Sequence, residues 1–138
     1  PPLLRRQRQM CIRDRHTYDI ALEKIMPVIL KANVKYLLIE SSNPRHAHEW
    51  KLFENIKLPK DKVIVPGVID STSNFVEHPE VVADRLIQFS KVVPKDQISA
   101  GADCGFSTFA GFGKVDEKIV SAKLKSLVDG AKLASKII

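Results

Sequence analysis

The sequence predicts an α/β fold in which about three strand–helix units form a parallel sheet. Segments with apolar residues at helical spacing alternate along the chain with short, unbroken apolar runs such as Tyr36 to Ile39. Unbroken runs are typical of parallel strands that are buried on both faces. Each run ends in a carboxylate, at Glu40, Asp70 and Asp103, and in a (β/α)₈ barrel that end of the strands forms the active-site face.

The first expected element is a helix over 20–32. Asp19 is its candidate N-cap and Pro27 a candidate kink. Its apolar residues at roughly helical spacing are Ile20, Ile25, Ile29 and Leu30. The elements expected next are a strand over 36–39, a helix over 48–56 and a strand over 62–70.

The second half of the chain repeats this order. A helix over 78–93 has Pro79 in its first turn, and His78 before it is expected to be structural. The apolar face of this helix consists of Val82, Leu86 and Phe89. The last elements are a strand over 97–104 and an amphipathic helix over 115–137, with apolar residues Ile119, Leu124, Leu127 and Val128.

Charge and composition point away from nucleic acid and membranes. Of the net charge of +6 on 138 residues, +4 lies in residues 1–15, which leaves +2 for residues 16–138. Such a nearly neutral body does not favour an anionic partner. No apolar run approaches the ~18 residues that span a bilayer, and nothing resembles a secretory signal. With only two cysteines, we expect a cytoplasmic protein that acts on small molecules.

The stretch RRQRQMCIRDR, residues 5–15, is not expected to belong to the natural protein. Its charge alone suits a basic arm that binds nucleic acid. Translated back into codons, however, all eleven residues match DNA that resembles a transposon-end adapter of sequencing libraries. We therefore interpret residues 1–15 as an adapter-derived artefact without a domain, and 16–138 as one domain fragment whose N-terminal part is missing.

Three strand–helix units fit either an open doubly wound sheet or part of a barrel. An open sheet usually carries a glycine-rich phosphate loop after its first strand. The candidates here, residues 100–105 and 111–114, match no Walker or dinucleotide pattern. The barrel is therefore favoured.

Glu40 and Cys104 are the candidate metal ligands. They stand at equivalent ends of two strands, so in a closed barrel both side chains reach one mouth. A carboxylate and a thiolate are both ligands of Zn²⁺, but a catalytic zinc needs three protein ligands and an open position. From the residues alone, it stays open whether Cys104 is simply buried and Glu40 salt-bridged.

Two stretches carry a resemblance to a known family, LLIESSNPRHAHEW and VPGVIDSTSNFVEHPEVVADRLIQFSKVVPKDQISAGADCGFSTFAG. They resemble the C-terminal end of the cobalamin-independent methionine synthases, in particular the shorter, single-domain branch. The resemblance implies the C-terminal portion of a (β/α)₈ TIM barrel. It also implies a zinc-dependent methyltransferase of methionine biosynthesis, which moves a methyl group from a methyltetrahydrofolate polyglutamate to homocysteine.

In that family, zinc is held by a His-x-Cys pair, a glutamate and a cysteine. By resemblance, Glu40 corresponds to the glutamate and Cys104 to the cysteine of the DCG motif. The His-x-Cys pair is expected shortly upstream of His16, where the adapter-like stretch lies. Cys11 does not replace its cysteine, because the residue two positions earlier is Gln9.

Thr72 departs from the family pattern. In methionine synthase proper, the segment after Gly-Val reads Asp-Ile-His-Ser, and its histidine is the proton donor to the folate leaving group. Thr72 stands at that histidine position in the segment DSTS. A threonine hydroxyl is not a general acid near neutral pH, so this residue argues against the folate-dependent reaction.

Arg45, His46 and Asp70 are the candidate substrate-binding residues. Arg45 and His46 lie on the polar loop after Glu40, a place suited to binding a substrate carboxylate. An alternative for this loop is a second zinc site made by His46 and His48. The phenylalanines from Phe106 to Phe112 are expected to pack in the core or to line the mouth beside Cys104.

Other functions stay open at this point. Thr72 favours zinc-dependent alkyl transfer to another thiol, as in an epoxyalkane:coenzyme M transferase. A uroporphyrinogen decarboxylase shares the barrel but needs no Glu/Cys metal pair. Because a complete barrel takes about 250 residues, a further interpretation is a non-catalytic barrel fragment that is inactive alone.

Overall fold

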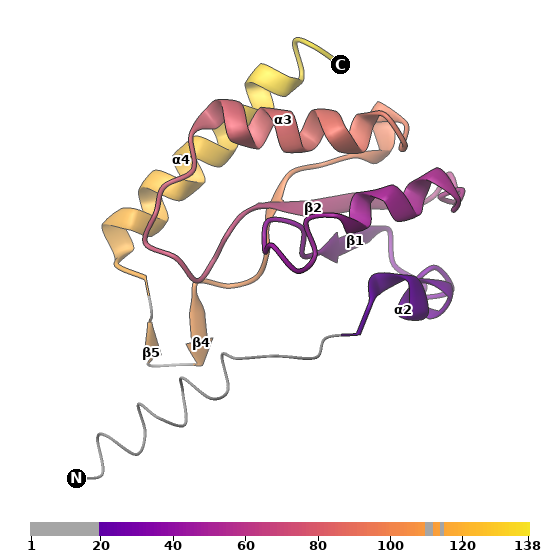
Figure 1. Cartoon of the computed structure of the whole chain (residues 1–138), viewed down its shortest axis with the longest axis horizontal. Helices are drawn as coiled ribbons and strands as arrows, with labels where there is room; N and C mark the ends of the chain where they lie inside the picture. Colours follow the sequence, from indigo (N-terminus) through magenta and orange to yellow (C-terminus); the bar gives the residue numbers. More distant parts are fainter. Residues whose placement is uncertain (1–19, 110–111, 114) are drawn as a thin grey trace, which may run out of the picture.

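The computed structural model describes residues 20–109, 112–113 and 115–138. Side chains are described for all of these residues except those between 107 and 114. Its main sheet has three parallel strands in the order β1 (Tyr36–Ile39), β2 (Val63–Ile69) and β3 (Gly101–Ala102) (Figure 1). The predicted α/β fold with a parallel sheet is confirmed. The third strand is far shorter than the expected 97–104, because its pairing with β2 shifts register between Gly67 and Ile69 and leaves Ile98 with one isolated bridge to Ile64.

The helices cover the sheet unevenly. Figure 1 shows α3 (Pro79–Ser90) and α4 (Glu117–Ala134) crossing over one side of the sheet, while α2 (Leu22–Ile29) lies beside β1. The remaining elements are two 3₁₀ helices, η1 (Glu49–Glu54) and η2 (Lys95–Gln97), and a hairpin of β4 (Ser107–Phe109) and β5 (Phe112–Gly113). The helix predicted over 48–56 is present as the shorter 3₁₀ helix η1.

The first helix buries only part of the predicted apolar set, since Ile29 and Leu30 pack partly buried against the core. It begins at Leu22 with Ala21 as its N-cap, and the predicted cap Asp19 lies outside the described residues. Leu22 and Met26, four residues apart, are buried, whereas Ile20 and Ile25 are 63% and 38% exposed. A tertiary contact fixes this start, because the Leu22 N–H donates to the carboxylate of Glu49 over 2.8 Å.

The predictions for α3 are confirmed. Val82, Leu86 and Phe89 are buried, together with Ala83. His78 is the N-cap, and its Nδ1 accepts a hydrogen bond from the Glu80 N–H over 3.3 Å. The expected structural role of His78 is therefore borne out.

The predicted apolar face of α4 is confirmed only in part, because Ile119 and Leu127 are partly buried and Leu127 packs against the core. Leu124 and Val128 are 44% and 50% exposed. The residues buried instead are Lys123, Ser126, Gly130 and Ala134. The physical reason is close helix packing: a Cβ on Gly130 would lie 2.5 Å from the Cβ of Val82 and 2.6 Å from the carbonyl oxygen of Pro79.

Two apolar clusters hold the layers together. The first joins β1, α2 and η1 to the end of α3, and its members include Met26, Ile39, Phe53, Ile64 and Phe89. The second lies between β2, α3 and α4, and consists of Val68, Ile69, Val82, Ala83, Leu86 and Ala134. The carboxyl half of β2 is thus fixed against both long helices.

Strand β1 is not buried on both faces, contrary to the prediction. Leu37 and Ile39 are buried, but Tyr36 and Leu38 are 57% and 71% exposed, because no described residue covers that face. A groove of about 380 Å³ lies between this face and α2. A second groove, of about 630 Å³, lies beside η2 and α4. Both grooves are lined mainly by apolar side chains.

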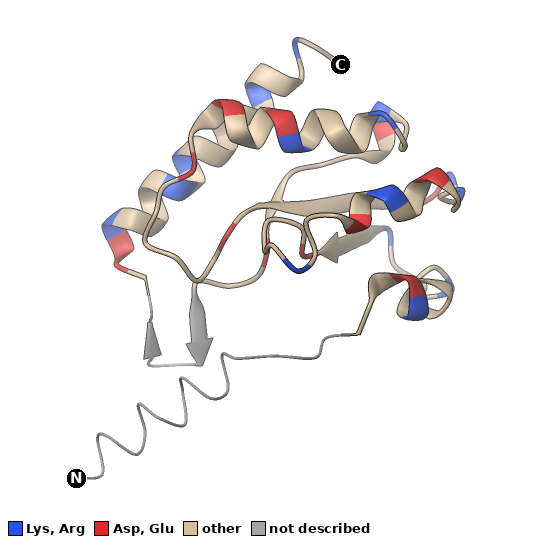
Figure 2. Ribbon diagram, in the orientation of Figure 1, with Lys and Arg blue, Asp and Glu red and all other residues tan. Residues whose placement is uncertain are grey.

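Charged residues of both signs alternate over the helices and outer loops, as Figure 2 shows for the described part of the chain. Helix α3 carries Glu80, Asp84 and Arg85, whereas lysines outnumber acidic residues along α4. Within the described residues, no helix is both long and apolar enough to span a bilayer.

Candidate functional site

The carboxyl ends of the three parallel strands meet at one edge of the sheet, which we call the rim. Glu40 directly follows β1, Asp70 follows β2, and Asp103 and Cys104 follow β3. Because parallel strands share their direction, all four residues belong to this one edge. The expected gathering of polar residues at the strand ends is therefore confirmed.

Asp103 holds the rim together across a long stretch of sequence. Its Oδ1 accepts hydrogen bonds of 2.9 Å from the backbone N–H groups of Ser41 and Ser42. Its Oδ2 accepts one of 2.7 Å from the Ser42 hydroxyl and one of 2.9 Å from the Asn43 N–H. The carboxylate thus fixes the loop after Glu40 to the end of β3, and the sequence alone assigned it no such role.

Gly67 on β2 makes room for this carboxylate. A Cβ at this position would meet Asp103 Oδ1 and would lie 2.6 Å from Asp103 Cα and 2.7 Å from its nitrogen. The Gly67 carbonyl accepts a 2.6 Å hydrogen bond from the buried Ser41 hydroxyl. Glycine is therefore required where β1, β2 and β3 are tied together.

Glu40 and Cys104, the predicted metal ligands, lie on segments that the Asp103 carboxylate joins. Glu40 directly precedes Ser41 and Cys104 directly follows Asp103, and the Ser41 N–H donates a hydrogen bond to the Asp103 carboxylate. Both are exposed, and Cys104 is a free cysteine. The buried Ser71 hydroxyl lies 2.9 Å from the Cys104 sulfur. Cys104 is thus not the buried residue of the alternative interpretation, and metal binding stays a prediction.

Asp70 organises its own loop. Its carboxylate accepts hydrogen bonds from the Thr72 N–H (3.1 Å), the Thr72 hydroxyl (3.0 Å) and the Ser73 N–H (2.8 Å). Burial raises the pKa of Asp70, but the hydrogen bonds from Ser73 and Thr72 outweigh it, so the pKa lies below its ordinary value. Substrate binding by Asp70 stays a prediction.

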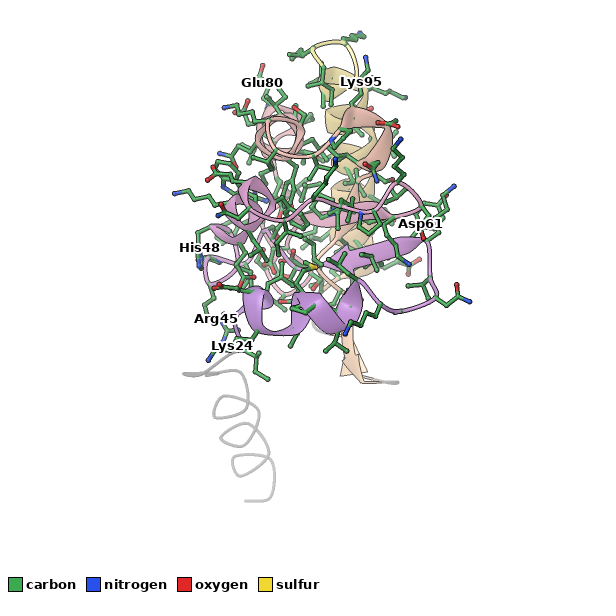
Figure 3. The ribbon with its side chains drawn as sticks, turned by 90° about the vertical axis from the view of Figure 1, so that its right-hand side faces the viewer. Lys24, Arg45, His48, Asp61, Glu80 and Lys95 are labelled. Atoms are coloured by element: carbon green, nitrogen blue, oxygen red, sulfur yellow. The ribbon has the colours of Figure 1, made fainter. Side chains whose placement is uncertain are left out.

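The loop after Glu40 presents its two candidate substrate residues differently. His46 Nδ1 lies 2.8 Å from Oε2 of Glu49, whose Oε1 accepts from the Leu22 N–H, and His46 lines the groove beside Glu40. Figure 3 places Arg45 and His48 at the periphery of the molecule.

The side chains of Ser107 to Gly113 lie outside the described set, and Phe106 packs partly against the second apolar cluster.

The rim offers ligand types that suit zinc, but too few of them. A carboxylate and a thiol are suitable ligands, whereas a catalytic zinc needs three from the protein. Among the described residues, no group of three or more His, Cys, Asp or Glu side chains could hold a metal ion. A second site at His46 and His48 likewise stays a prediction. The described residues alone therefore do not complete a zinc site.

Comparisons with known proteins agree with the fold. Residues 10–133 match the model of the family described as cobalamin-independent synthase, catalytic domain. A B12-independent methionine synthase from Shewanella sp. W3-18-1, solved in complex with selenomethionine, is similar with a TM-score of 0.68 and 26% identity. The similarity covers 83% of this chain and 30% of that chain.

Two curated proteins are similar in sequence. A 2-hydroxypropyl-CoM lyase from Xanthobacter autotrophicus (strain ATCC BAA-1158 / Py2) is 29% identical over 119 residues, 85% of this chain and 30% of that protein. The uncharacterized protein YxjG of Bacillus subtilis (strain 168) is 29% identical over 114 residues, 81% of this chain and 28% of that protein. The chain thus spans less than a third of the length of these relatives.

The family match covers residues 10–133, and the similarity to the methionine synthase structure covers 83% of the chain. The rim therefore corresponds to the carboxyl-end face of part of a TIM barrel. The chain belongs to the cobalamin-independent synthase catalytic domain family of enzymes.

Proposed function

We propose that the enzyme containing these residues transfers a methyl or other alkyl group to the sulfur of a small thiol, with zinc as its cofactor. The observation that carries the proposal is the arrangement of Glu40 and Cys104. These exposed donors lie on rim segments that the Asp103 carboxylate joins directly. Membership of a family that includes methionine synthases supports the reaction class.

Glu40 and Cys104 are proposed as two of the zinc ligands. By resemblance, the remaining ligands are a His-x-Cys pair upstream of His16. Bound zinc would supply a Lewis acid that keeps an acceptor thiol in its thiolate form. The residues of this chain hold the rim in shape: Asp103 fixes the loop after Glu40, and the Ser71 hydroxyl contacts the Cys104 sulfur.

Homocysteine is the first candidate acceptor, with a methyl-folate as donor, because the resemblance implies methionine synthesis. His46 is a better candidate than Arg45 for contact with the substrate. It lines the groove beside Glu40, whereas Arg45 lies at the periphery (Figure 3). A thiol acceptor also suits a reducing compartment, so we propose the cytoplasm.

Alkyl transfer to another small thiol, such as coenzyme M, is the second candidate. Thr72 favours it, because the Thr72 hydroxyl donates to Asp70 over 3.0 Å and does not replace an acidic imidazolium. The similarity to a 2-hydroxypropyl-CoM lyase supports the same candidate.

Turnover assays on the complete gene product that contains this sequence distinguish the two candidates. Methionine formed from homocysteine and a methyl-folate would support the first, and alkylated coenzyme M formed from an epoxide would support the second. If neither product forms, and other small thiols also fail as acceptors, the proposed reaction class is wrong.

Metal binding is tested separately by titrating this chain with Co²⁺, which reports thiolate coordination through a charge-transfer absorption band. In a Cys11→Ser background we expect a weak band that Cys104→Ser abolishes and Glu40→Gln weakens. Glu80→Gln, at an exposed carboxylate on α3, is the matched control and should leave the band unchanged. A band that Glu40→Gln leaves as strong as in the Cys11→Ser background would contradict the assignment of Glu40 as a ligand beside Cys104.

A further inference from the structure

A buried ion pair lies behind the rim, on the side of α4. The Lys123 side chain is completely buried, and its Nζ lies 2.9 Å from Oε2 of Glu77, which is itself 11% exposed. Burying an ammonium group is costly unless a partner compensates it. Such a lysine is therefore unexpected on a helix face that otherwise buries small residues.

Glu77 connects this ion pair to the rim. While Oε2 faces Lys123, Oε1 accepts a 2.7 Å hydrogen bond from the backbone N–H of Asp70, the first residue after β2. The Ser126 hydroxyl, also on α4, donates to the Glu77 carbonyl. Helix α4 therefore holds both the backbone carbonyl and the side-chain carboxylate of Glu77. The carboxylate in turn links α4 to the residue that follows β2.

From Asp70 the connection continues to the candidate ligand. The Asp70 carboxylate fixes Thr72 and Ser73 by three hydrogen bonds of 2.8–3.1 Å. Ser71, which lies between Asp70 and Thr72, places its hydroxyl 2.9 Å from the Cys104 sulfur. The loop 70–73 is thus held by Glu77 at its first amide and touches the proposed site through Ser71.

We propose that Lys123 is a positioning residue, which acts through Glu77 on the loop 70–73 and so sets the place of Ser71 beside Cys104. This rests on the proposed function, in which Cys104 is a ligand. Lys123 itself touches no substrate and no reacting group. Its charge keeps the Glu77 carboxylate oriented so that the other oxygen receives the Asp70 N–H.

Amide hydrogen exchange on this chain, followed by NMR, tests the proposal without any assay of activity. Glu77→Ala removes both contacts and should speed exchange of the Asp70 amide roughly tenfold. Lys123→Met, of similar length but uncharged, should speed exchange at Asp70, Thr72 and Ser73 roughly threefold and shift the Cys104 amide resonance. The double variant should behave like Glu77→Ala alone, because both changes act through one carboxylate.

Two internal comparisons make the result decisive. Lys125→Met removes an exposed ion pair with Asp129 on the same helix and should leave the loop unchanged. The amides of Ser41, Ser42 and Asn43, which Asp103 holds, should exchange at the same rate in all variants. A uniform rise in exchange over the whole chain, or loop exchange equal to that of Lys125→Met, would overturn the positioning role. Failure of the cobalt or turnover assays would instead concern the proposed function.

Discussion

Asp103 and Asp70 occupy equivalent places, each directly after one of two neighbouring strands, yet they stabilise the rim in different ways. Asp103 accepts hydrogen bonds from residues 60 to 62 positions away, on the loop after β1. Asp70 accepts them from residues two and three positions away, within its own turn. One carboxylate therefore joins strands, and the other shapes a loop.

The difference separates tertiary from local structure. A carboxylate that caps the two residues after it forms a turn wherever the chain allows one. A carboxylate that binds three successive amides of another strand's loop needs the whole sheet in place first. Loss of Asp103 should therefore weaken the fold, whereas loss of the Asp70 charge should affect mainly one loop.

The largest effect is expected for Asp103→Ala. Leaving three backbone N–H groups and a hydroxyl without their charged acceptor should lower the free energy of unfolding by about 3 kcal/mol. Urea denaturation measures this change. Asp84→Ala, at an exposed carboxylate on α3, is the control and should change stability by less than about 0.5 kcal/mol. Equal losses in the two variants would show that Asp103 does not join the strands.

Gly67→Ala should have the next largest effect. The added methyl group meets the Asp103 side chain and backbone, and overpacking of this kind costs about 2 kcal/mol. Denaturation of Gly105→Ala gives the control, because a Cβ on Gly105 would have no atom within 4 Å. In an Asp103→Ala background the cost should shrink but not vanish, since the contacts with the Asp103 backbone remain. A fully additive pair would argue against the contact.

The smallest effect concerns the Asp70 charge and its dependence on pH. Because the folded-state pKa is lowered, the ionised carboxylate stabilises the fold fully above its unfolded pKa of about 3.9. This contribution is lost as pH falls through the lower folded-state value. Asp70 is largely solvated, so we expect less than about 1 kcal/mol.

Unfolding of the unsubstituted chain and of Asp70→Asn, measured between about pH 6 and pH 2.5, checks this prediction. Their stability difference should be constant above about pH 5 and should shrink as the pH falls toward the acidic end. A difference that grows as the pH falls would contradict the sign of the shift.

The helices show how far local patterns reach. The apolar spacing of Val82, Leu86 and Phe89 predicts the buried face of α3 correctly, because that helix packs on the sheet through large apolar residues. The same reasoning holds only in part for α4: Leu127 is partly buried, but Gly130 allows a close approach to α3 and Lys123 pairs with Glu77. Small residues and a buried lysine carry no hydrophobic signal, so spacing could not reveal that face.

The sequence by itself predicted the parallel α/β fold and the polar strand ends, and its resemblance to a family named Glu40 and Cys104 as candidate ligands. These depend on apolar runs, turns and residue types that neighbours in the chain supply. Only the tertiary structure decided that Asp103 ties the loop after Glu40 to β3, that Gly67 makes room for it, and that Lys123 reaches the rim through Glu77. These contacts join residues 62, 36 and 46 positions apart, respectively, and they exist only once packing brings the strands and α4 together.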